Sequence, residues 1–234
     1  MSSKLLTLCS LVVLASAVAH ADTITTWNAS GTPDSDGHGS AWAQITVETS
    51  GTILVTLKSL EVDPNAAGQA VSGIDILLSN GVTAAVIDTQ LGQLIDVGGT
   101  PHVATNVVGN PTHWGTGAAG SHLFLETAGG YAVGGTPIDM IVGAGDHLTD
   151  YKNLNSSFTK NHLPLIDGVA YFDLDANGIT ADTTVVGVTF LFGTGPDGPL
   201  TGHRVPVTPE PSSLVLFGTG ILGLAGAVRR RMKV

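Results

Sequence analysis

Apolar and polar residues alternate along two neighbouring stretches near the start of the chain, over residues 42–48 and again over 53–58. Successive side chains of a β-strand point to opposite faces, so this alternation predicts two strands, each with one apolar face. Ser50 and Gly51 lie between the two stretches, and both residue types favour turns. The pattern therefore predicts a β-hairpin.

Further short apolar runs are strand candidates, and clusters of Gly, Pro, Asn and Asp separate them. They are residues 74–78, 82–87, 122–126, 138–142, 169–174 and 185–192. No part of the core shows the 3.6-residue apolar repeat of a helix. The fold class that we predict is all-β: an antiparallel β-sandwich of jelly-roll type, with surface loops over 92–120 and 147–164.

The first 21 residues have the three parts of a signal peptide. Lys4 supplies the positive region, residues 5–18 supply the apolar region, and an A-x-A cleavage site ends the segment at residue 21. The mature chain is expected to begin at Asp22, and it would then lack Cys9, the one cysteine of the sequence. That excludes disulfides, thiolate metal ligands and a cysteine nucleophile.

The C-terminal end carries an uncharged run of 17 residues, 212–228, and a basic cluster follows it: Arg229, Arg230, Arg231 and Lys233. A helix of this length would span about 25 Å, slightly less than the ~30 Å hydrocarbon core of a membrane. Basic residues beside a span stay on the cytoplasmic side. We therefore expect one C-terminal transmembrane helix, with the core outside the inner membrane. The alternative is a buried core helix, against which the apolarity all round the segment argues.

Consecutive parts of this end resemble the PEP-CTERM sorting signal of Gram-negative bacteria that produce exopolysaccharide. They are Pro209, Glu210 and Pro211, the glycine-punctuated run 217–226, and the arginine cluster. The resemblance implies that a membrane enzyme of the exosortase type cuts near Pro209 to Pro211 and releases or re-attaches the mature protein. The core is also similar to a group of exported PEP-CTERM proteins with small β-rich domains, on motifs such as 113–115 and 178–183. This second likeness implies a fold more than a function.

These signals divide the chain into a signal peptide (1–21), a β-sandwich domain (22–192), a linker (193–207) and a sorting signal with its membrane anchor (208–234). Residues 22–208 contain four basic residues against eighteen acidic ones, a net charge of −14. This charge argues against nucleic acid as a partner, because phosphate neutralisation needs a basic surface. An acidic surface suits a soluble extracellular protein, or weak cation binding in an anionic matrix.

One acidic stretch matches the first half of a calcium-binding loop. Residues 173–178 have the residue types of the first six EF-hand positions, with Asp173, Asp175 and Asn177 as the ligands. The twelfth position is Thr184, where a bidentate Glu is required. A β-turn is the alternative interpretation. We predict no metal and no cofactor, and the loop is kept only as a candidate for weak calcium binding.

A second stretch, residues 34–40, holds Asp, Ser and His, the residue types of a serine-hydrolase triad, within seven positions. Triad members usually come from distant parts of a chain, and no G-x-S-x-G elbow occurs elsewhere in this one. The preferred interpretation is a polar loop, in which Asp34 and Asp36 are only candidates for cation binding. No enzymatic activity is predicted.

The remaining candidates are single histidines and the tryptophans. The histidines His102, His113, His122, His147, His162 and His203 lack the close pair typical of a zinc site. Trp27, Trp42 and Trp114 could stack on sugar rings. We expect an exported envelope or matrix protein with a structural or adhesive role linked to exopolysaccharide. The alternative is a carbohydrate-binding module that uses an exposed Trp or Tyr, and a secreted hydrolase is the third hypothesis.

Overall fold

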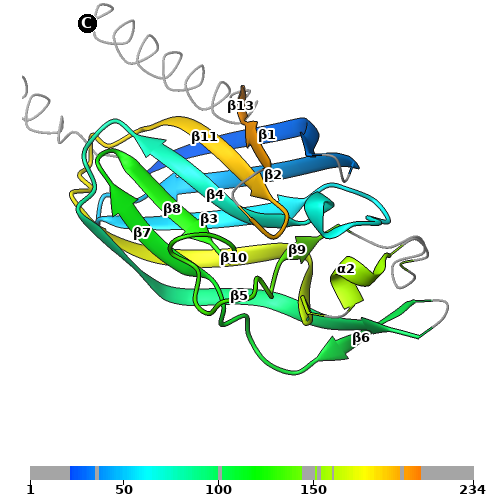
Figure 1. Ribbon diagram of the computed structural model, residues 1–234. Coiled ribbons are helices and arrows are strands. Elements are labelled where there is room, and N and C mark those ends of the chain that lie inside the picture. Colours follow the sequence, from blue (N-terminus) through cyan, green and yellow to red (C-terminus); the bar gives the residue numbers. More distant parts are fainter. Residues whose placement is uncertain are drawn as a thin grey trace, which may run out of the picture. The chain divides into compact units, whose positions relative to one another are not determined.

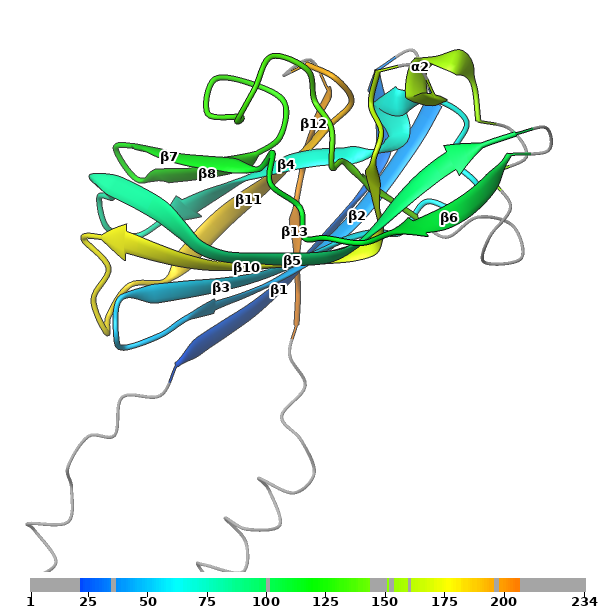
Figure 2. The ribbon, with the colours of Figure 1, turned by 90° about the horizontal axis from the view of Figure 1, so that it is seen from below.

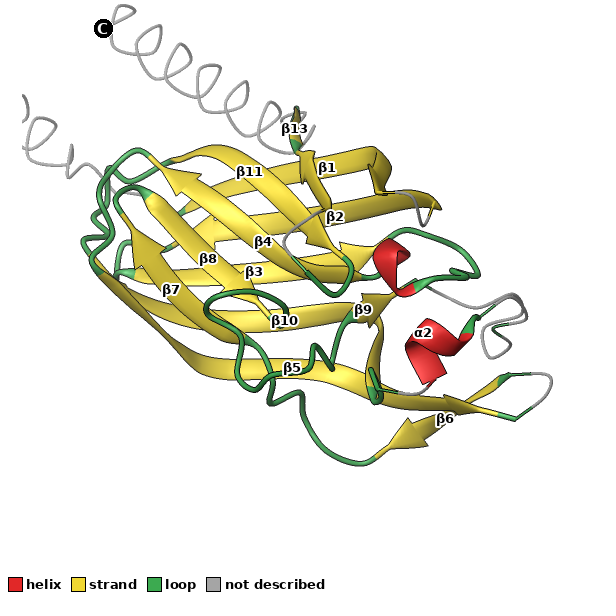
Figure 3. Cartoon of the chain, viewed as in Figure 1, coloured by secondary structure: helices red, strands yellow, loops and turns green. Residues whose placement is uncertain are grey.

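The computed structural model describes residues 22–34, 37–99, 102–143, 151, 154–159, 161–195 and 198–206. Strands dominate this part of the chain (Figure 3), which confirms the all-β class. The strands are β1 (Thr23–Asp34), β2 (Gly37–Val47), β3 (Thr52–Ser59), β4 (Val71–Leu78), β5 (Ala84–Gly98), β6 (Val103–Val107), β7 (Gly115–Ala119), β8 (His122–Glu126), β9 (Ile141–Val142), β10 (Leu165–Asn177), β11 (Val185–Phe192), β12 (Gly198–Thr201) and β13 (His203–Val205). The helical elements described are η1 (Ala67–Gln69), a turn of 3-10 helix, and α2 (Ser156–Thr159). The predicted signal peptide and C-terminal transmembrane helix lie outside the described residues.

Hydrogen bonds join the strands in the order β12-β11-β4-β9-β10-β3-β2-β1-β13 (Figures 1 and 2). β5 pairs with β10 and carries β6, while β8 pairs with β4 and carries β7. β9 and β10 are parallel, and the other pairs whose register the described residues define are antiparallel. β10 is therefore the junction of the sheet, because it pairs with β3, β5 and β9.

The strands are arranged as two groups that face each other (Figure 2). We call β5, β10, β3, β2 and β1 layer A, and β7, β8, β4 and β11 layer B. Buried apolar side chains of both groups form one core cluster. The Trp114 ring, just before β7, packs on Phe172 of β10 with ring centroids 4.8 Å apart. A side chain at Gly39 of β2 would meet the ring of Phe192 on β11 at 2.9 Å, so this close approach of the layers requires glycine.

The hairpin predicted from the alternating pattern is confirmed. β2 and β3 pair antiparallel, with Ala43 opposite Leu57 and Ile45 opposite Val55, and these inward side chains are buried. Gly51 in the connecting turn has φ +99°, a left-handed conformation that favours glycine. The bounds predicted at 122–126 and 185–192 are those of β8 and β11. Jelly-roll connectivity stays a prediction.

Several segments differ from the prediction. β1 was not expected, since Thr25, Trp27 and Ala29 provide its buried face and two of these residues are weakly apolar. The predicted loop at 92–120 contains the end of β5 together with β6 and β7, and the predicted loop at 147–164 contains α2. Part of the predicted linker, 193–207, forms β12, which pairs with β11, and β13, next to β1. These segments are polar or glycine-rich, so their strand conformation depends on pairing with neighbours rather than on an apolar pattern.

A smaller buried cluster lies beside the main core. Tyr151 and Phe158 are fully buried and pack with Met140, Val142 and residues of β5 and β10. The Tyr151 hydroxyl donates a hydrogen bond to the carbonyl of Gly143 at 3.2 Å, so the polar end of this side chain is satisfied. This cluster packs Tyr151, Leu154 and Phe158 beside β5 and β10.

We expect Phe190→Ala to lower the free energy of unfolding by about 3–5 kcal/mol, because this fully buried ring of β11 would leave a cavity between the layers. Val186→Ala, on the same strand, is the control. Val186 is 57% exposed, so its truncation should change the free energy by less than about 0.5 kcal/mol. Urea unfolding followed by circular dichroism measures both, and equal effects would contradict the two-faced packing of β11.

Candidate functional site

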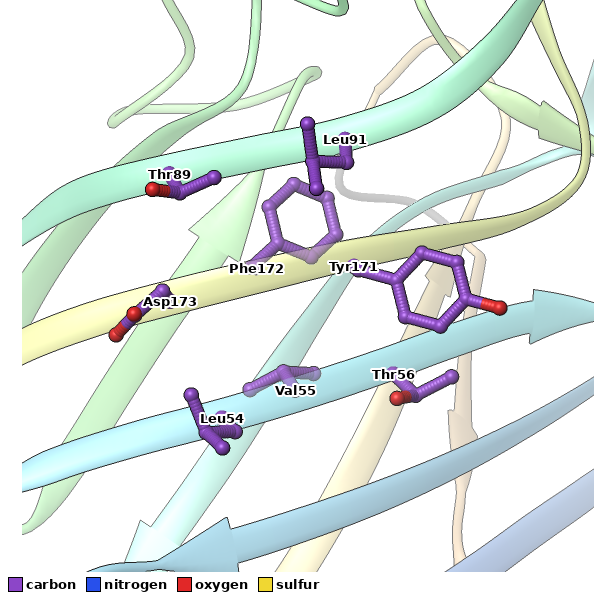
Figure 4. Close-up of a pocket in the computed structure, with 8 residues that line it drawn as sticks. All are labelled: Leu54, Val55, Thr56, Thr89, Leu91, Tyr171, Phe172 and Asp173. Atoms are coloured by element: carbon purple, nitrogen blue, oxygen red, sulfur yellow. The ribbon is translucent and has the colours of Figure 1, made fainter.

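A groove of about 300 Å³ lies on the outward face of layer A, over β5, β10 and β3 (Figure 4). The antiparallel register aligns its side chains in two rows. Leu91, Tyr171 and Thr56 form the first row, and Thr89, Asp173 and Leu54 form the second. The buried side chains of Val55 and Phe172 complete the lining.

The groove is unusual for an outward sheet face because it exposes large apolar side chains. Tyr171 is 48% exposed, Leu91 44% and Leu54 36%. Exposed apolar side chains that cluster and are rimmed by polar groups are typical of a binding surface. Here the polar groups are the hydroxyls of Thr56 and Thr89 and the carboxylate of Asp173. A ring face beside hydroxyl and carboxyl groups is suited to a ligand that has both C–H faces and hydroxyls.

β10 positions these side chains by the alternation of its sequence. Ala170, Phe172 and Leu174 are buried in the core, so Tyr171 and Asp173 must point outward. Because the strand is central, each outward side chain has a neighbour on both sides. The groove is therefore built on a strand that the core holds in place.

Negative charge gathers at one end of the groove. Burial, which removes hydration from the carboxylate, raises the pKa of Asp173, and the charges of Asp88, Asp175 and Glu48 raise this pKa further. Between Asp173 and Leu174 the register of β10 against β5 shifts, which inserts Asp88 as an extra residue. This irregularity places an additional carboxylate on that side of the groove.

Of the tryptophans proposed to stack on sugars, Trp42 alone lies on the outward face. Trp27 and Trp114 are 5% and 1% exposed and belong to the core. Trp42 is partly exposed on β2, and the ammonium group of Lys58 lies 4.9 Å from the centroid of its ring. This cation–π contact covers part of the indole and fixes its orientation. Among the Phe, Tyr and Trp rings in the described part of layer A, that of Tyr171 is the most exposed, and the sequence did not single it out.

The calcium-loop candidate, for which a wrapped loop and a β-turn were the two interpretations, forms the end of a strand. Asp173, Asp175 and Asn177 are outward residues of β10, and the turn comes only at Gly178. Alternate residues of a strand are roughly 7 Å apart along a straight line, whereas an EF-hand loop wraps its ligands around one ion. Within the described residues, no group of three or more His, Cys, Asp or Glu side chains is positioned to hold a metal. The EF-hand resemblance reflects an alternation of acidic outward and apolar inward residues.

Among the described residues no histidine lines the groove, and three of the predicted histidines have separate partners. His113 Nδ1 is 2.9 Å from the buried carboxylate of Asp139, and His122 Nδ1 is 2.9 Å from the partly exposed carboxylate of Asp75. His162 donates to the carbonyl of Pro137 at 2.6 Å. His147 lies outside the described residues. Each of these contacts ties a loop or a strand end to its neighbour.

The heptapeptide 34–40 contributes one residue to a polar network. His38 lies between Ser30 of β1 and Glu61, which follows β3, with 2.9 Å to each. Ser40 instead donates to the carbonyl of Ala29. Ser35, Asp36 and the side chain of Asp34 lie outside the described residues. Sequence spacing did not indicate the partners of His38, because strand pairing brings them together.

The comparison with protein families concerns the other end of the chain. Residues 207–231 match the PEP-CTERM protein-sorting motif. The chain carries a PEP-CTERM sorting signal. This signal implies export, association with the membrane, and sorting that depends on an exosortase as the processing partner. No curated protein and no solved structure matches the chain.

The parts of the PEP-CTERM signal itself lie outside the described residues: Pro209, Glu210 and Pro211, the run 212–228, and the basic cluster of Arg229, Arg230, Arg231 and Lys233. Among the residues that are described, no helix is both long and apolar enough to cross a membrane. The predicted anchor and the roles of these residues stay predictions.

Asp173→Asn tests the electrostatics of the groove. A carboxyl group whose pKa is raised by folding contributes stability that is complete below its ordinary pKa, 3.8 for Asp, and that is lost as pH rises through the raised value. The free energy of unfolding of the variant, relative to the parent, should therefore increase as pH rises from about 3 to 7, since Asn has no such loss.

Unfolding midpoints measured over this pH range check the expectation. Asp96→Asn, at the exposed far end of β5, controls for the loss of one negative charge. A stability difference for Asp173→Asn that stays flat, or that falls with rising pH, would contradict the raised pKa.

Proposed function

We propose that this protein is an exported, exosortase-processed protein of the bacterial envelope or extracellular matrix, and that it adheres to exopolysaccharide through the groove of layer A. This proposal combines two of the hypotheses, an adhesive role and a carbohydrate-binding module. Binding of polysaccharide in the groove would attach the protein to the matrix. We interpret the two facing layers as a β-sandwich of jelly-roll type.

The observation that carries the proposal is the ring of Tyr171, which is about half exposed between Leu91 and the hydroxyl of Thr56. A sugar ring presents apolar C–H groups on its faces and hydroxyls around its rim. An aromatic side chain can cover the face while Thr and Asp side chains bond the rim. Aromatic side chains lose little conformational entropy on binding, which suits repeated weak contacts along a polymer.

Two further features support this role. The strong negative charge of the mature core argues against nucleic acid, and it leaves neutral hydroxyl-rich polymers as suitable ligands. The groove is also open along a sheet face, so a long chain could cross it without having to thread an end. The side chains that line the groove include no pairing of a nucleophile with a histidine, which favours binding over turnover at this position.

Tyr171→Ala should weaken binding to the exopolysaccharide purified from the host bacterium by about five- to thirtyfold, since truncation of a central aromatic contact typically costs about 1–2 kcal/mol. Affinity electrophoresis in gels that contain the polysaccharide measures the effect. The matched control is Tyr131→Ala, because Tyr131 is 40% exposed and packs on Phe124 of layer B. Equal retardation of parent and Tyr171→Ala would contradict binding at the groove.

Processing of the sorting signal gives a separate prediction. Proline holds a backbone extended and disfavours helix at the preceding residue, so the stretch from Pro209 to Pro211 should be extended and accessible to an enzyme at the membrane surface. We expect intact-mass measurements on protein from wild-type cells to show a C-terminus near these residues. Protein from cells that lack the exosortase should end at Val234, and an end at Val234 in both strains would contradict processing.

A further inference from the structure

Three side chains at one end of layer A are linked in a row. Ser30 Oγ lies 2.9 Å from His38 Nε2, and His38 Nδ1 lies 2.9 Å from Glu61 Oε2. Both nitrogens of the imidazole ring are therefore engaged, one by a hydroxyl and the other by a carboxylate. Ser30 is in β1, His38 is in β2 and Glu61 follows β3, so their convergence is a product of the fold.

The chemistry of the partners determines where the protons are. An ionised carboxylate can only accept hydrogen bonds, so the contact with Glu61 requires a hydrogen on Nδ1 of His38. In neutral imidazole the other nitrogen, Nε2, then carries the lone pair, and the Ser30 hydroxyl donates to it. This is the order of contacts in which a serine becomes a nucleophile: a hydroxyl on a base, and the base held by a carboxylate.

Strand pairing positions each member. Ser30 lies on β1 directly opposite Ser40 of β2, and His38 lies two residues before Ser40 on the same outward face. Glu61 follows the end of β3, where the backbone N–H of Leu60 donates to the carbonyl of Ser40. The Gln69 side chain donates a hydrogen bond to the backbone carbonyl of His38 at 3.0 Å, which helps to fix the backbone that carries the imidazole. Next to Ser30 the β1–β2 register shifts between Gly31 and Asp34, a strand irregularity of the kind that often adjoins active sites.

The three side chains are exposed to different degrees, as the roles of nucleophile, base and orienting carboxylate require. Ser30 is exposed and the His38 side chain is 53% exposed, whereas the Glu61 side chain is only 18% exposed. A reacting molecule can thus reach the hydroxyl, and the carboxylate is the shielded member. A purely structural cross-link would not require the hydroxyl to be at the accessible end.

We propose that Ser30, His38 and Glu61 form a serine-hydrolase relay that cleaves carboxylic esters, with O-acyl groups on polysaccharide as the class of substrate. The choice of polysaccharide rests on the proposed function, while ester cleavage does not. Trp42 lies on the same outward face, two residues from Ser40 along β2. The row of Tyr171 continues through Thr56 and Gln44 to Thr26 of β1, four residues before Ser30. The relay and Tyr171 are therefore roughly 20 Å apart on one face, a distance that a single polysaccharide chain can bridge.

The reaction divides into two balanced steps. Ser30 Oγ attacks the ester carbonyl carbon while its proton passes to His38 Nε2. The carbon–oxygen bond to the sugar then breaks, and the departing sugar oxygen takes that proton. Water next attacks the acyl group on Ser30, giving its proton to His38. The bond to Oγ breaks, the proton returns to Ser30, and a carboxylic acid is released.

A fluorophosphonate probe tests the nucleophile, because an activated serine displaces its fluoride and keeps the phosphonyl group. The purified exported protein should acquire the adduct on Ser30, located by fragmentation of the tryptic peptide. Ser30→Ala should lose the label, and Ser40→Ala, which removes the hydroxyl directly opposite, should keep it. Absence of an adduct on Ser30 in the folded protein would overturn the proposal.

Further variants test the relay itself. His38→Gln and Glu61→Gln should each slow labelling by about 100-fold or more, the usual contribution of a positioned general base. Glu48→Gln is the control for a lost carboxylate on the same layer. Thermal unfolding of every variant verifies folding, and labelling of folded His38→Gln at the parental rate would overturn the relay.

Different results would contradict polysaccharide binding at the groove and ester cleavage by the relay. Tyr171→Ala should lose polysaccharide retention yet label normally with the small probe, and Ser30→Ala should do the reverse. Release of acid from the host exopolysaccharide by the parent, but not by Ser30→Ala, supports the substrate class. Labelling of Ser30 without release of acid from that polymer overturns the polysaccharide assignment.

Discussion

The pairing of β10 with β3, β5 and β9 is the constraint on which the rest of layer A depends. A central strand has its backbone groups bonded on both sides, so its side chains can only point into the core or outward. The core needs Phe172, which packs on Trp114, and Leu174. Tyr171 and Asp173 are consequently exposed. The residues of β10 that line the outside of the groove are therefore those that the core does not use.

Much of this fold could be predicted where one face of a strand is strongly apolar. The alternation around Ile45 and Val55 was sufficient for the hairpin, and the bounds of β8 and β11 agree with the apolar runs. β1 was missed because its inward residues include Thr25 and Ala29, which give little apolar signal. β12 and β13 were missed because their strand conformation depends on pairing with neighbouring strands, and their own sequences carry no apolar pattern.

The candidate sites were harder to predict, for a physical reason. Acidic residues on alternate positions of β10 imitate the spacing of a calcium loop, although in a strand they diverge along a line. His38 was noticed for its neighbours in sequence, yet its contacts are with Ser30 and Glu61, eight and twenty-three residues away. Periodicity indicates which face a residue occupies, but the partner across the sheet depends on register.

Register also links the groove to the relay. Every outward residue of β1, β2 and β3 owes its position to the β1–β2 and β2–β3 pairings. A shift of one residue in a strand exchanges its two faces, which would turn Ser30 and Trp42 inward and expose Ala29 and Ala43. The burial of Ile45, Val55 and Leu57 opposes any such slip, because each would have to leave the core for water. The same apolar side chains that stabilise the hairpin therefore keep the polar face of layer A in alignment.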